Sequence, residues 1–442
     1  MSVTLDWIAS AGGPLRGTIT VPGDKSVSHR AVMFAALADG RTDIHGFLEG
    51  EDTRATAAIF TQLGVRIEAP SPSRRIMHGV GLHGLRAPGA PLDCGNAGTG
   101  MRLLAGLLAG QAFDSVLVGD ASLSKRPMRR VVEPLAAMGA RIVTSAAGTA
   151  PLHIQGGQRL HGGDLVLPVA SAQLKSALLL AGLYASGVTR VREPHPTRDY
   201  TERMLKAFGA DVREVDGWIS LQPGAVLRSP GRIDVPADFS SAAFFMVAAS
   251  IVPGSDVLIE DVGINPRRTG LLDTLRDMGA DITVERRRES GGEPVADLRV
   301  RHAALHGIDV PPARVPDMID EFPALFVAAA FARGTTRITG AEELRVKESD
   351  RIAVMAKALK SLGADIAERG DGAVIQGGAP LHGGVVDSAG DHRCAMSMVV
   401  AAQRAQAPVT IADCANVATS FPGFVELASG AGMSIRPLAS SP

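Results

Sequence analysis

Cations gather at the start of a predicted helix in the stretch VPGDKSVSHRAVMFAAL, residues 21–37. Backbone N–H groups already give the first turn of a helix partial positive charge, so cations there are unfavourable unless an anion lies beside them. One polar arc of the helix, which we expect to be free to bind, carries Lys25, Ser26, His29 and Arg30. Unpaired N–H donors, a hydroxyl and cations suit phosphate or carboxylate, so the stretch predicts an anion site. A solvated first turn is the alternative.

The segment SKRPMRR, residues 124–130, repeats this device. If the segment is helical, it sets like charges four residues apart, and these repel unless an anion lies between them. The two pairs are Lys125 with Arg129 and Arg126 with Arg130.

Two later segments also combine cations with carboxylates. VKESDR, residues 346–351, has Lys347 and Arg351 four apart, and in isolation a salt-bridged surface helix explains it better than a binding site. DHRCAMS places Asp391, His392 and Arg393 directly before a predicted buried helix. A capping Asp followed by exposed cations is the alternative to an anion site there.

Two segments rich in small residues precede further apolar helices. GNAGTGMR, residues 95–102, has Asn96 and Thr99 before a predicted buried helix and Arg102 in its first turn, and its small residues let backbone N–H groups close around an anion. It matches neither a dinucleotide fingerprint nor a P-loop, which lowers support for a nucleotide-binding fold. ASAQLKS supplies Ser171, Gln173 and Lys175, groups suited to a polyhydroxylated or phosphorylated ligand. The alternative is capping by Ser171, with the other two side chains solvated.

Two carboxylates stand among these segments. Asp320 directly precedes an apolar helix, where a carboxylate is either an N-cap or a positioned base, and capping is the commoner role. If the cationic segments converge, the pKa values of Asp320 and Glu348 are expected to shift, which makes acid/base chemistry credible.

Secondary-structure elements that recur six times along the chain must position these residues. Phrases such as QLGVRIEA and DMGADITV recur 69 to 84 residues apart, by subtraction of the positions of their glycines. Each predicts a helix that ends at a Gly and turns into a short strand. The six glycines are Gly64, Gly139, Gly209, Gly279, Gly363 and Gly432. The longest interval contains ERRRESGGEP, residues 285–294, which we expect to be a charged loop insertion.

A second phrase also recurs six times, as a polar start followed by an Ala-rich apolar helix, for example ADFSSAAFFMVAAS. Alternation of these helices with β-rich runs predicts an α/β fold. Three repeats in each half predict two similar domains with a seam near Val235 to Asp238.

Composition excludes several classes of function. The formal net charge is −1 and the chain has two Trp and two Tyr, so neither a nucleic acid nor an anionic membrane is an expected partner. Three scattered cysteines form neither a disulfide framework nor a CxxC metal site. We therefore expect a soluble cytoplasmic protein, with no secretion signal at its N-terminus.

Eight ordered motifs between residues 23 and 422 closely resemble the 5-enolpyruvylshikimate-3-phosphate synthase family, and TGMRL with the insertion at 285–294 resembles the second of its two sequence classes. The eight motifs are GDKSVSHR, GNAGTGMRLL, GDASLSKRPM, SAQLKSALLLAG, IDEFPAL, LRVKESDR, DHRCAMS and TSFP. The resemblance implies the enolpyruvyl transferase fold, with two inverse α/β domains that each contain three βαβαββ repeats. It implies one domain at 24–236 on the shikimate 3-phosphate side, and a second at 1–23 and 237–442 on the phosphoenolpyruvate side with the catalytic carboxylates. The active site would lie in a cleft that closes between them.

The activity that the resemblance implies is carboxyvinyl transfer in aromatic amino acid biosynthesis. The 5-hydroxyl of shikimate 3-phosphate would add to C2 of phosphoenolpyruvate, and phosphate would leave a tetrahedral intermediate. No metal or organic cofactor is implied, and we expect a monomer. The residues implied for shikimate 3-phosphate are Lys25, Ser26, Arg30, Ser171, Ala172, Gln173, Arg198, Asp320 and Lys347. Those implied for phosphoenolpyruvate are Lys25, Gly98, Arg126, Gln173, Arg351 and Arg393.

The resemblance also implies catalytic roles. Asp320 resembles the base that takes the 5-hydroxyl proton, and Glu348 with Lys25 resembles a proton relay to the phosphoenolpyruvate methylene. Ala418 and Thr419 depart from the family pattern, because many members have Lys there. Gly98 stands where a larger residue obstructs glyphosate in tolerant members, so glyphosate is expected to compete with phosphoenolpyruvate.

Two alternatives stay open. The UDP-N-acetylglucosamine enolpyruvyl transferases share the fold, but residues 111–130 lack the Cys that they usually carry. A non-catalytic sugar-phosphate binding protein is the other alternative, and retention of Asp320 and Glu348 argues against it, because extra carboxylates weaken anion binding.

Overall fold

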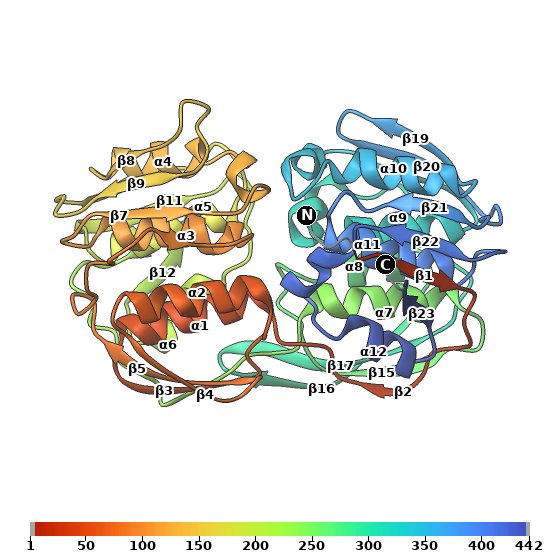
Figure 1. The fold of residues 1–442 in the computed structure, drawn as a ribbon, viewed down its shortest axis with the longest axis horizontal. Helices are drawn as coiled ribbons and strands as arrows, with labels where there is room; N and C mark the ends of the chain where they lie inside the picture. The colour runs from red at the N-terminus through yellow and green to blue at the C-terminus, as the bar shows by residue number, and fades with distance from the viewer. Residues whose placement is uncertain (1–4, 439–442) are drawn as a thin grey trace. The chain divides into compact units, whose positions relative to one another are not determined.

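The computed structural model describes residues 5–438, and its chain divides into two compact units. Unit 1 comprises residues up to Pro22, Ala237–Glu289 and the chain from Pro294 onward, and unit 2 comprises Gly23–Pro236 with Ser290–Glu293. Both combine helices with β-sheets, so the α/β prediction is confirmed (Figure 1).

Unit 2 consists of three four-stranded sheets, each accompanied by two helices. The sheet orders are β14(Arg232–Asp234)-β3(Asp39–His45)-β5(Arg74–Val80)-β4(Arg66–Ser71), β6(Leu92–Asp93)-β7(Ser115–Val118)-β9(Leu152–Gln155)-β8(Arg141–Val143) and β10(His161–Val166)-β11(Ser186–Arg192)-β13(Trp218–Leu221)-β12(Val212–Val215). The helices are α1(Lys25–Leu37), α2(Glu51–Gln62), α3(Gly98–Ala109), α4(Arg129–Ala137), α5(Ala172–Gly182) and α6(Tyr200–Ala207).

Unit 1 has the corresponding arrangement among its described residues. The sheet orders are β16(Asp281–Ser290)-β17(Glu293–Arg301)-β15(Asp256–Gly263)-β2(Arg16–Ile19), β18(Gly334–Ile338)-β20(Gly372–Gly377)-β19(Asp365–Arg369) and β21(Gly384–Asp387)-β22(Val409–Ala412)-β1(Trp7–Ser10)-β23(Ser434–Pro437). The helices are α7(Phe239–Ile251), α8(Gly270–Asp277), α9(Phe322–Phe331), α10(Arg351–Ser361), α11(His392–Ala402) and α12(Phe424–Gly430).

Two strands belong to a different unit from the helix that follows each of them in the chain. β2 precedes α1 in the chain but pairs in parallel with β15 of unit 1, whereas β14 precedes α7 but pairs in parallel with β3 of unit 2. The chain passes between units within two similar phrases, VPGD and VPAD. The Asp24 amide donates to the Pro236 carbonyl at 2.8 Å, and the Asp238 amide donates to the Pro22 carbonyl at 2.8 Å.

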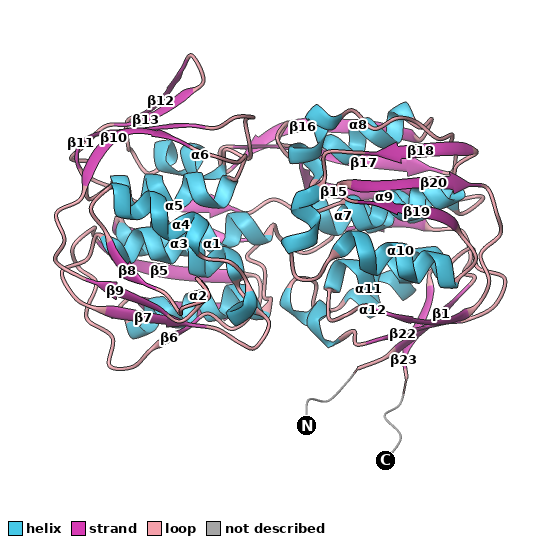
Figure 2. Cartoon of the chain, turned by 90° about the horizontal axis from the view of Figure 1, so that it is seen from above, coloured by secondary structure: helices cyan, strands magenta, loops and turns pink. Residues whose placement is uncertain are grey.

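Each unit has its own hydrophobic core, built on the Ala-rich helices that the second repeated phrase predicts. In unit 2 these are α1, α3 and α5, and in unit 1 they are α7, α9 and α11; Figure 2 shows them among the sheets of each unit. At Gly106 of α3, a Cβ atom would lie 2.0 Å from the Ala177 carbonyl oxygen of α5. Close packing of these two helices therefore requires glycine.

The repeat glycines behave as predicted. All six adopt positive φ, between 90° and 111°, directly after the helix that each ends. The predicted loop at residues 285–294 is wrong, because β16 and β17 form a hairpin there. Gly291 and Gly292 both have positive φ, which suits a two-residue turn between right-twisted strands. Within residues 5–438 we find no helix with the length and apolar character needed to cross a bilayer.

Candidate active site

In unit 2, the start of α1 pairs its first cation with a carboxylate. Asp24 caps the helix by accepting from the Val27 amide at 2.8 Å, so Lys25 is the first helical residue. Lys25 Nζ lies 2.9 Å from Oδ2 of Asp52, and Ser26 is half-buried beside it. The Asp52 carboxylate therefore offsets part of the positive charge at this helix end.

Two residues of the polar arc of α1, His29 and Arg30, are buried, whereas the sequence predicted a fully accessible arc. Arg30 is buried, and it donates to the hydroxyls of Thr201 and Ser176 at 2.7 and 2.8 Å. Burial, with the nearby Arg198 charge, lowers the pKa of Arg30 to about 10. His29 is also buried, with Nδ1 2.8 Å from the Thr56 hydroxyl, and burial lowers its pKa to about 3. Neighbouring elements cover these two residues, which a helical projection cannot show.

The start of α3 brings two guanidinium groups together. The helix begins at Gly98, where an added Cβ would lie 2.8 Å from Nη1 of Arg126 and 3.3 Å from Nη1 of Arg102. Arg126 donates to Oδ1 of Asn96 at 2.6 Å. The Gly98 position thus leaves the space that these cations occupy beside the positive end of the helix.

The segment at residues 124–130 is not one helix, so the predicted repulsion between Lys125 and Arg129 does not arise. A 3₁₀ turn covers Leu123–Lys125, Arg126 is extended, and α4 begins at Arg129.

The start of α5 is joined to that of α3. Ser171 caps α5, as the sequence alternative suggested, and Ala172 is its first residue. Gln173 is not simply solvated, because its Oε1 accepts from Arg102 Nη1 at 2.6 Å and its Nε2 donates to the Thr99 hydroxyl at 2.9 Å.

Lys175 is buried in ion pairs rather than solvated. Its Nζ lies 2.8 Å from carboxylate oxygens of both Glu193 and Glu202, and its side chain is 1% exposed. Glu193 also accepts from the Thr197 hydroxyl at 2.5 Å, while Lys175 donates to the Thr197 carbonyl at 3.2 Å. These contacts hold the backbone next to Arg198, in the loop between β11 and α6.

In unit 1, Asp320 faces two arginines. Its Oδ2 lies 3.0 Å from Nη1 of Arg268, and its Oδ1 lies 3.6 Å from Nη1 of Arg351. The N-cap alternative for Asp320 is wrong, because Glu321 occupies that position of α9, and no side-chain bond caps the helix.

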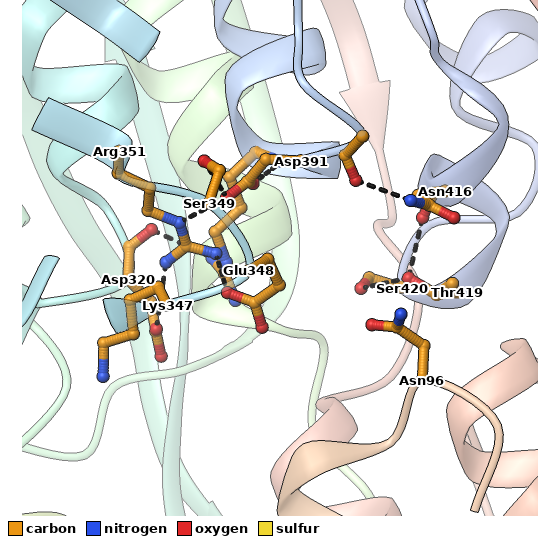
Figure 3. Close-up of polar contacts among 12 residues, drawn as sticks. Asn96, Asp320, Lys347, Glu348, Ser349, Arg351, Asp391, Asn416, Thr419 and Ser420 are labelled. Carbon is orange, nitrogen blue, oxygen red and sulfur yellow. Dashed lines mark hydrogen bonds and ion pairs between the residues drawn. The ribbon is translucent and has the colours of Figure 1, made fainter. Parts of the chain in front are cut away.

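Arg351 binds three carboxylates in the close-up of Figure 3. Its side chain is 1% exposed, with Nε 2.8 Å from Asp391 Oδ2 and Nη2 2.5 Å from Glu348 Oε2. Burial alone would lower the pKa of Arg351, but the carboxylates of Asp391, Glu348 and Asp320 raise it overall. Arg351 is therefore fixed and charged, and it places Glu348 near Asp320.

Lys347 and Arg351 do not share a helix, contrary to the spacing argument. A 3₁₀ helix ends at Val346, Lys347 lies in the bend that follows, and α10 begins at Arg351. Lys347 forms an ion pair with Glu343 at 3.2 Å.

The start of α11 contributes Arg393. Asp391 caps the helix by accepting from the Arg393 amide at 2.9 Å, as the capping alternative proposed, but Arg393 and His392 are buried rather than exposed. Arg393 Nη1 donates to the Asp320 backbone carbonyl at 3.1 Å.

Ala418 and Thr419, which stand where many family members have Lys, lie in a 3₁₀ helix, Ala415–Thr419. The Thr419 hydroxyl donates to the Asn416 carbonyl at 2.7 Å, and Asn416 Nδ2 donates to the Gly390 carbonyl at 2.6 Å (Figure 3). Hydroxyl and amide groups occupy this turn.

The predicted residues are thus divided between the two units, most of them at helix starts and in the loops beside them. In unit 2 they are Lys25, Ser26, Arg30, Gly98, Arg126, Ser171, Ala172, Gln173 and Arg198, and in unit 1 they are Asp320, Lys347, Glu348, Arg351 and Arg393. Arg268 and Glu321 also contact this set and were not predicted from the sequence. An Asn-Pro turn followed by two arginines, in NPRRTG, was the signal for Arg268. Residues 5–438 contain no group of three His, Cys, Asp or Glu side chains suited to a metal ion.

Comparison with known proteins gives one consistent family. The family model for EPSP synthase (3-phosphoshikimate 1-carboxyvinyltransferase) matches residues 9–427. A protein of Xanthomonas campestris pv. campestris (strain B100) named 3-phosphoshikimate 1-carboxyvinyltransferase is 66% identical over 436 residues, covering 98% of this chain and 99% of its own. A protein of the same name from Xanthomonas euvesicatoria pv. vesicatoria (strain 85-10) is 66% identical over 435 residues, covering 98% of each.

Solved structures agree. An EPSP synthase from Acinetobacter baumannii has a TM-score of 0.88 at 53% identity, covering 98% of this chain and 100% of its own. The enolpyruvyl transferase NikO from Streptomyces tendae has a TM-score of 0.80 at 18% identity. The match covers 99% of this chain and 100% of NikO, which shows a shared fold.

Proposed function

The chain belongs to the EPSP synthase family, and on that premise we propose how its residues divide the work of the reaction. The activity is transfer of the enolpyruvyl group of phosphoenolpyruvate to the 5-hydroxyl of shikimate 3-phosphate, with release of phosphate, in the shikimate pathway. Neither UDP-N-acetylglucosamine enolpyruvyl transfer nor binding without catalysis is favoured, because the relatives of high identity are named 3-phosphoshikimate 1-carboxyvinyltransferase.

Shikimate 3-phosphate is proposed to bind mainly to unit 2. The starts of α1 and α5 supply N–H donors, and Lys25, Arg30 and Arg198 supply positive charge for the phosphate and carboxylate. Hydrogen-bonding groups for the ring hydroxyls come from Ser26, Ser171 and Gln173. The full set adds Ala172, Asp320 and Lys347.

Phosphoenolpyruvate is proposed to bind through arginines of both units. Arg126 lies beside the start of α3 at Gly98, while Arg351 and Arg393 lie at the starts of α10 and α11. Guanidinium groups bind phosphate and carboxylate through two parallel hydrogen bonds, and Lys25 and Gln173 would contact both substrates.

Asp320 is proposed to take the proton of the 5-hydroxyl as that oxygen bonds to C2 of phosphoenolpyruvate. Glu348, with Lys25, delivers a proton to the C3 methylene, which gives a tetrahedral intermediate. Loss of a C3 proton with departure of phosphate then restores the double bond. One observation supports these roles above the others: Arg351 holds Glu348 at 2.5 Å and lies 3.6 Å from Asp320. Both carboxylates thus lie beside the same buried cation.

Phosphate release from phosphoenolpyruvate tests the acceptor. Shikimate 3-phosphate and UDP-N-acetylglucosamine are supplied separately, and release is expected with shikimate 3-phosphate alone. Release with neither acceptor, while both substrates still bind, would overturn the assignment. A monomeric state and a cytoplasmic location remain predictions; all three cysteines are free and buried.

A further inference from the structure

Arg268 lies in a turn that directs two consecutive arginines to different surroundings. The turn joins β15 to α8, and Asn265 organises it by accepting from the amides of Arg267 and Arg268 at 2.9 and 2.8 Å. Arg267 is 45% exposed, with Nη1 3.8 Å from Asp317. Arg268 is 5% exposed and is directed into the unit, at the starts of α7 and α9.

The Arg268 guanidinium joins the Asp320 carboxylate to the start of α7. Nη1 donates to Asp320 Oδ2 at 3.0 Å, and Nη2 donates to the Ser240 hydroxyl at 2.6 Å. Nη2 also lies 3.4 Å from Asp238, the N-cap of α7, whose amide is bound to the Pro22 carbonyl. Two side chains at the start of α7, Asp238 and Ser240, therefore hold Nη2 of Arg268.

Charge explains why a cation is buried here. Glu321 is fully buried, and burial raises the pKa of its carboxyl. Arg268 lies 3.5 Å from Glu321 and also faces Asp238 and Asp320, so one guanidinium offsets three carboxyl groups. A planar guanidinium can bind two groups at once in fixed directions, whereas an ammonium acts as a point charge.

We infer that Arg268 is a positioning residue for proton transfer by Asp320: it fixes the rotation of that carboxylate and stabilises its ionised form. The inference rests on the proposed role of Asp320 as base. A carboxylate free to rotate would spend less time in the orientation that accepts the 5-hydroxyl proton, and proton transfer requires hydrogen-bond geometry.

Other charged groups also surround Asp320, so the effect of Arg268 on pH dependence is partial. Arg351 faces Oδ1 from the start of α10, and Arg393 donates from α11 to the Asp320 carbonyl. Glu321 adjoins on the chain and opposes ionisation. Two further carboxylates act on these arginines, Asp238 on Arg268 and Glu348 on Arg351.

The test compares Arg268→Gln and Arg268→Lys with Arg267→Gln as the matched control. For Arg268→Gln we expect kcat to fall about 10-fold or more, with the KM for shikimate 3-phosphate little changed, because the loss is in proton transfer. The acid limb of the kcat profile should move about one pH unit toward higher pH. Arg267→Gln should change neither quantity. An unchanged kcat and acid limb in Arg268→Gln would overturn the inference.

Arg268→Lys decides the matter if the Gln variant does not fold. An ammonium cannot bind both Asp320 and Ser240 as the guanidinium does, so we expect the acid limb to stay and kcat to fall about threefold or more. A kcat equal to that of the parent would refute the inference.

Measuring Arg268→Lys in the Asp320→Asn background separates the role of Arg268 from the proposed role of Asp320 as base. If Arg268 acts through Asp320, then Arg268→Lys should lower kcat no further there, and an additive fall would contradict its role. Near-normal turnover of Asp320→Asn alone would instead remove the base assignment, which is a failure of the proposed function itself.

Discussion

Arg351 and Asp320 lie with Nη1 and Oδ1 3.6 Å apart, although Arg351 begins α10 and Asp320 lies in the turn before α9. The same guanidinium binds Glu348 and Asp391 and is 1% exposed. A buried cation with three carboxylate neighbours is fixed in direction, so it can hold two acid/base groups in one orientation. The proposed division between base and proton relay depends on this arrangement.

Replacing Asp320 by Asn should remove most turnover. The amide cannot accept the 5-hydroxyl proton, and loss of a proton-transfer group is expected to lower kcat about 10²–10⁴-fold. Binding of shikimate 3-phosphate, measured by calorimetry, should persist, because the cations of unit 2 are untouched. Asp317→Asn is the control, since that carboxylate lies beside Arg267 rather than Arg268. Near-normal turnover of Asp320→Asn would rule out the base assignment.

Replacing Gly98 by Ala should weaken inhibition by glyphosate. The added Cβ would lie 2.8 Å from Arg126 Nη1, so this guanidinium must shift from the site proposed for phosphoenolpyruvate. We expect competitive inhibition of the parent and an inhibition constant about 10-fold higher or more in the variant, which corresponds to about 1.4 kcal/mol.

Gly100→Ala is the matched control for this change. Its Cβ would approach the Thr56 hydroxyl at 3.0 Å rather than a cation near Gly98. Inhibition should therefore change less than in Gly98→Ala. A parent enzyme unaffected by millimolar glyphosate would contradict the prediction, as would an equal effect of both substitutions.

Replacing Lys175 by Met should destabilise unit 2 strongly. Burial raises the pKa of Glu202, and Lys175 opposes this shift. Removing one partner of a buried ion pair leaves uncompensated carboxylates, so we expect a loss of about 3–5 kcal/mol in the free energy of unfolding. Denaturant titration measures it. Lys206→Met, at an exposed position of the neighbouring α6, should cost about 0.5 kcal/mol or less. Equal losses in the two variants would show that the pairs of Lys175 contribute nothing.

His29 should make stability depend on pH. Its folded pKa of about 3 lies below the ordinary histidine pKa of 6.5, so between these values the unfolded chain binds the extra proton. The contribution to stability is complete above pH 6.5 and is lost progressively as pH falls toward 3. At pH 5.5 the loss should reach about 1.4 kcal/mol.

Unfolding free energies of the parent and His29→Gln, measured between pH 8 and pH 5.5, check this expectation. Glutamine can still bond to the Thr56 hydroxyl but does not titrate, so the difference between the two proteins should shrink as pH falls. A difference that is constant with pH would show that His29 is not buried in its neutral form.

The local structure of this chain could be predicted well, for reasons visible in single segments. Gly64 and its five equivalents had to end helices, because glycine adopts positive φ without strain, and all six do so. Runs such as FPALFVAAAF are apolar on every side, so burial of α9 follows from composition alone. The motifs were also sufficient to indicate the family, since their order spans nearly the whole chain.

Several of the predictions that failed depended on charge partners. Lys175 could have been solvated or bound to a ligand as far as its neighbours in sequence show, yet it pairs with Glu193 and Glu202. The segment at residues 285–294 contains enough charge for a loop, but Asp297, which is buried, binds Arg286 and Arg288 across the hairpin. Alternation alone does not reveal such cross-strand pairs.

The sequence by itself determined where helices end, which helices are buried and which family the chain resembles, because these depend on backbone preference and on the apolar character of short segments. Only the tertiary structure decided which charges face one another. Arg30 meets Thr201, and Arg268 meets Asp320, through contacts between residues distant in the chain. The ionisation and orientation of a side chain depend on those neighbours and on burial, and no local pattern contains either.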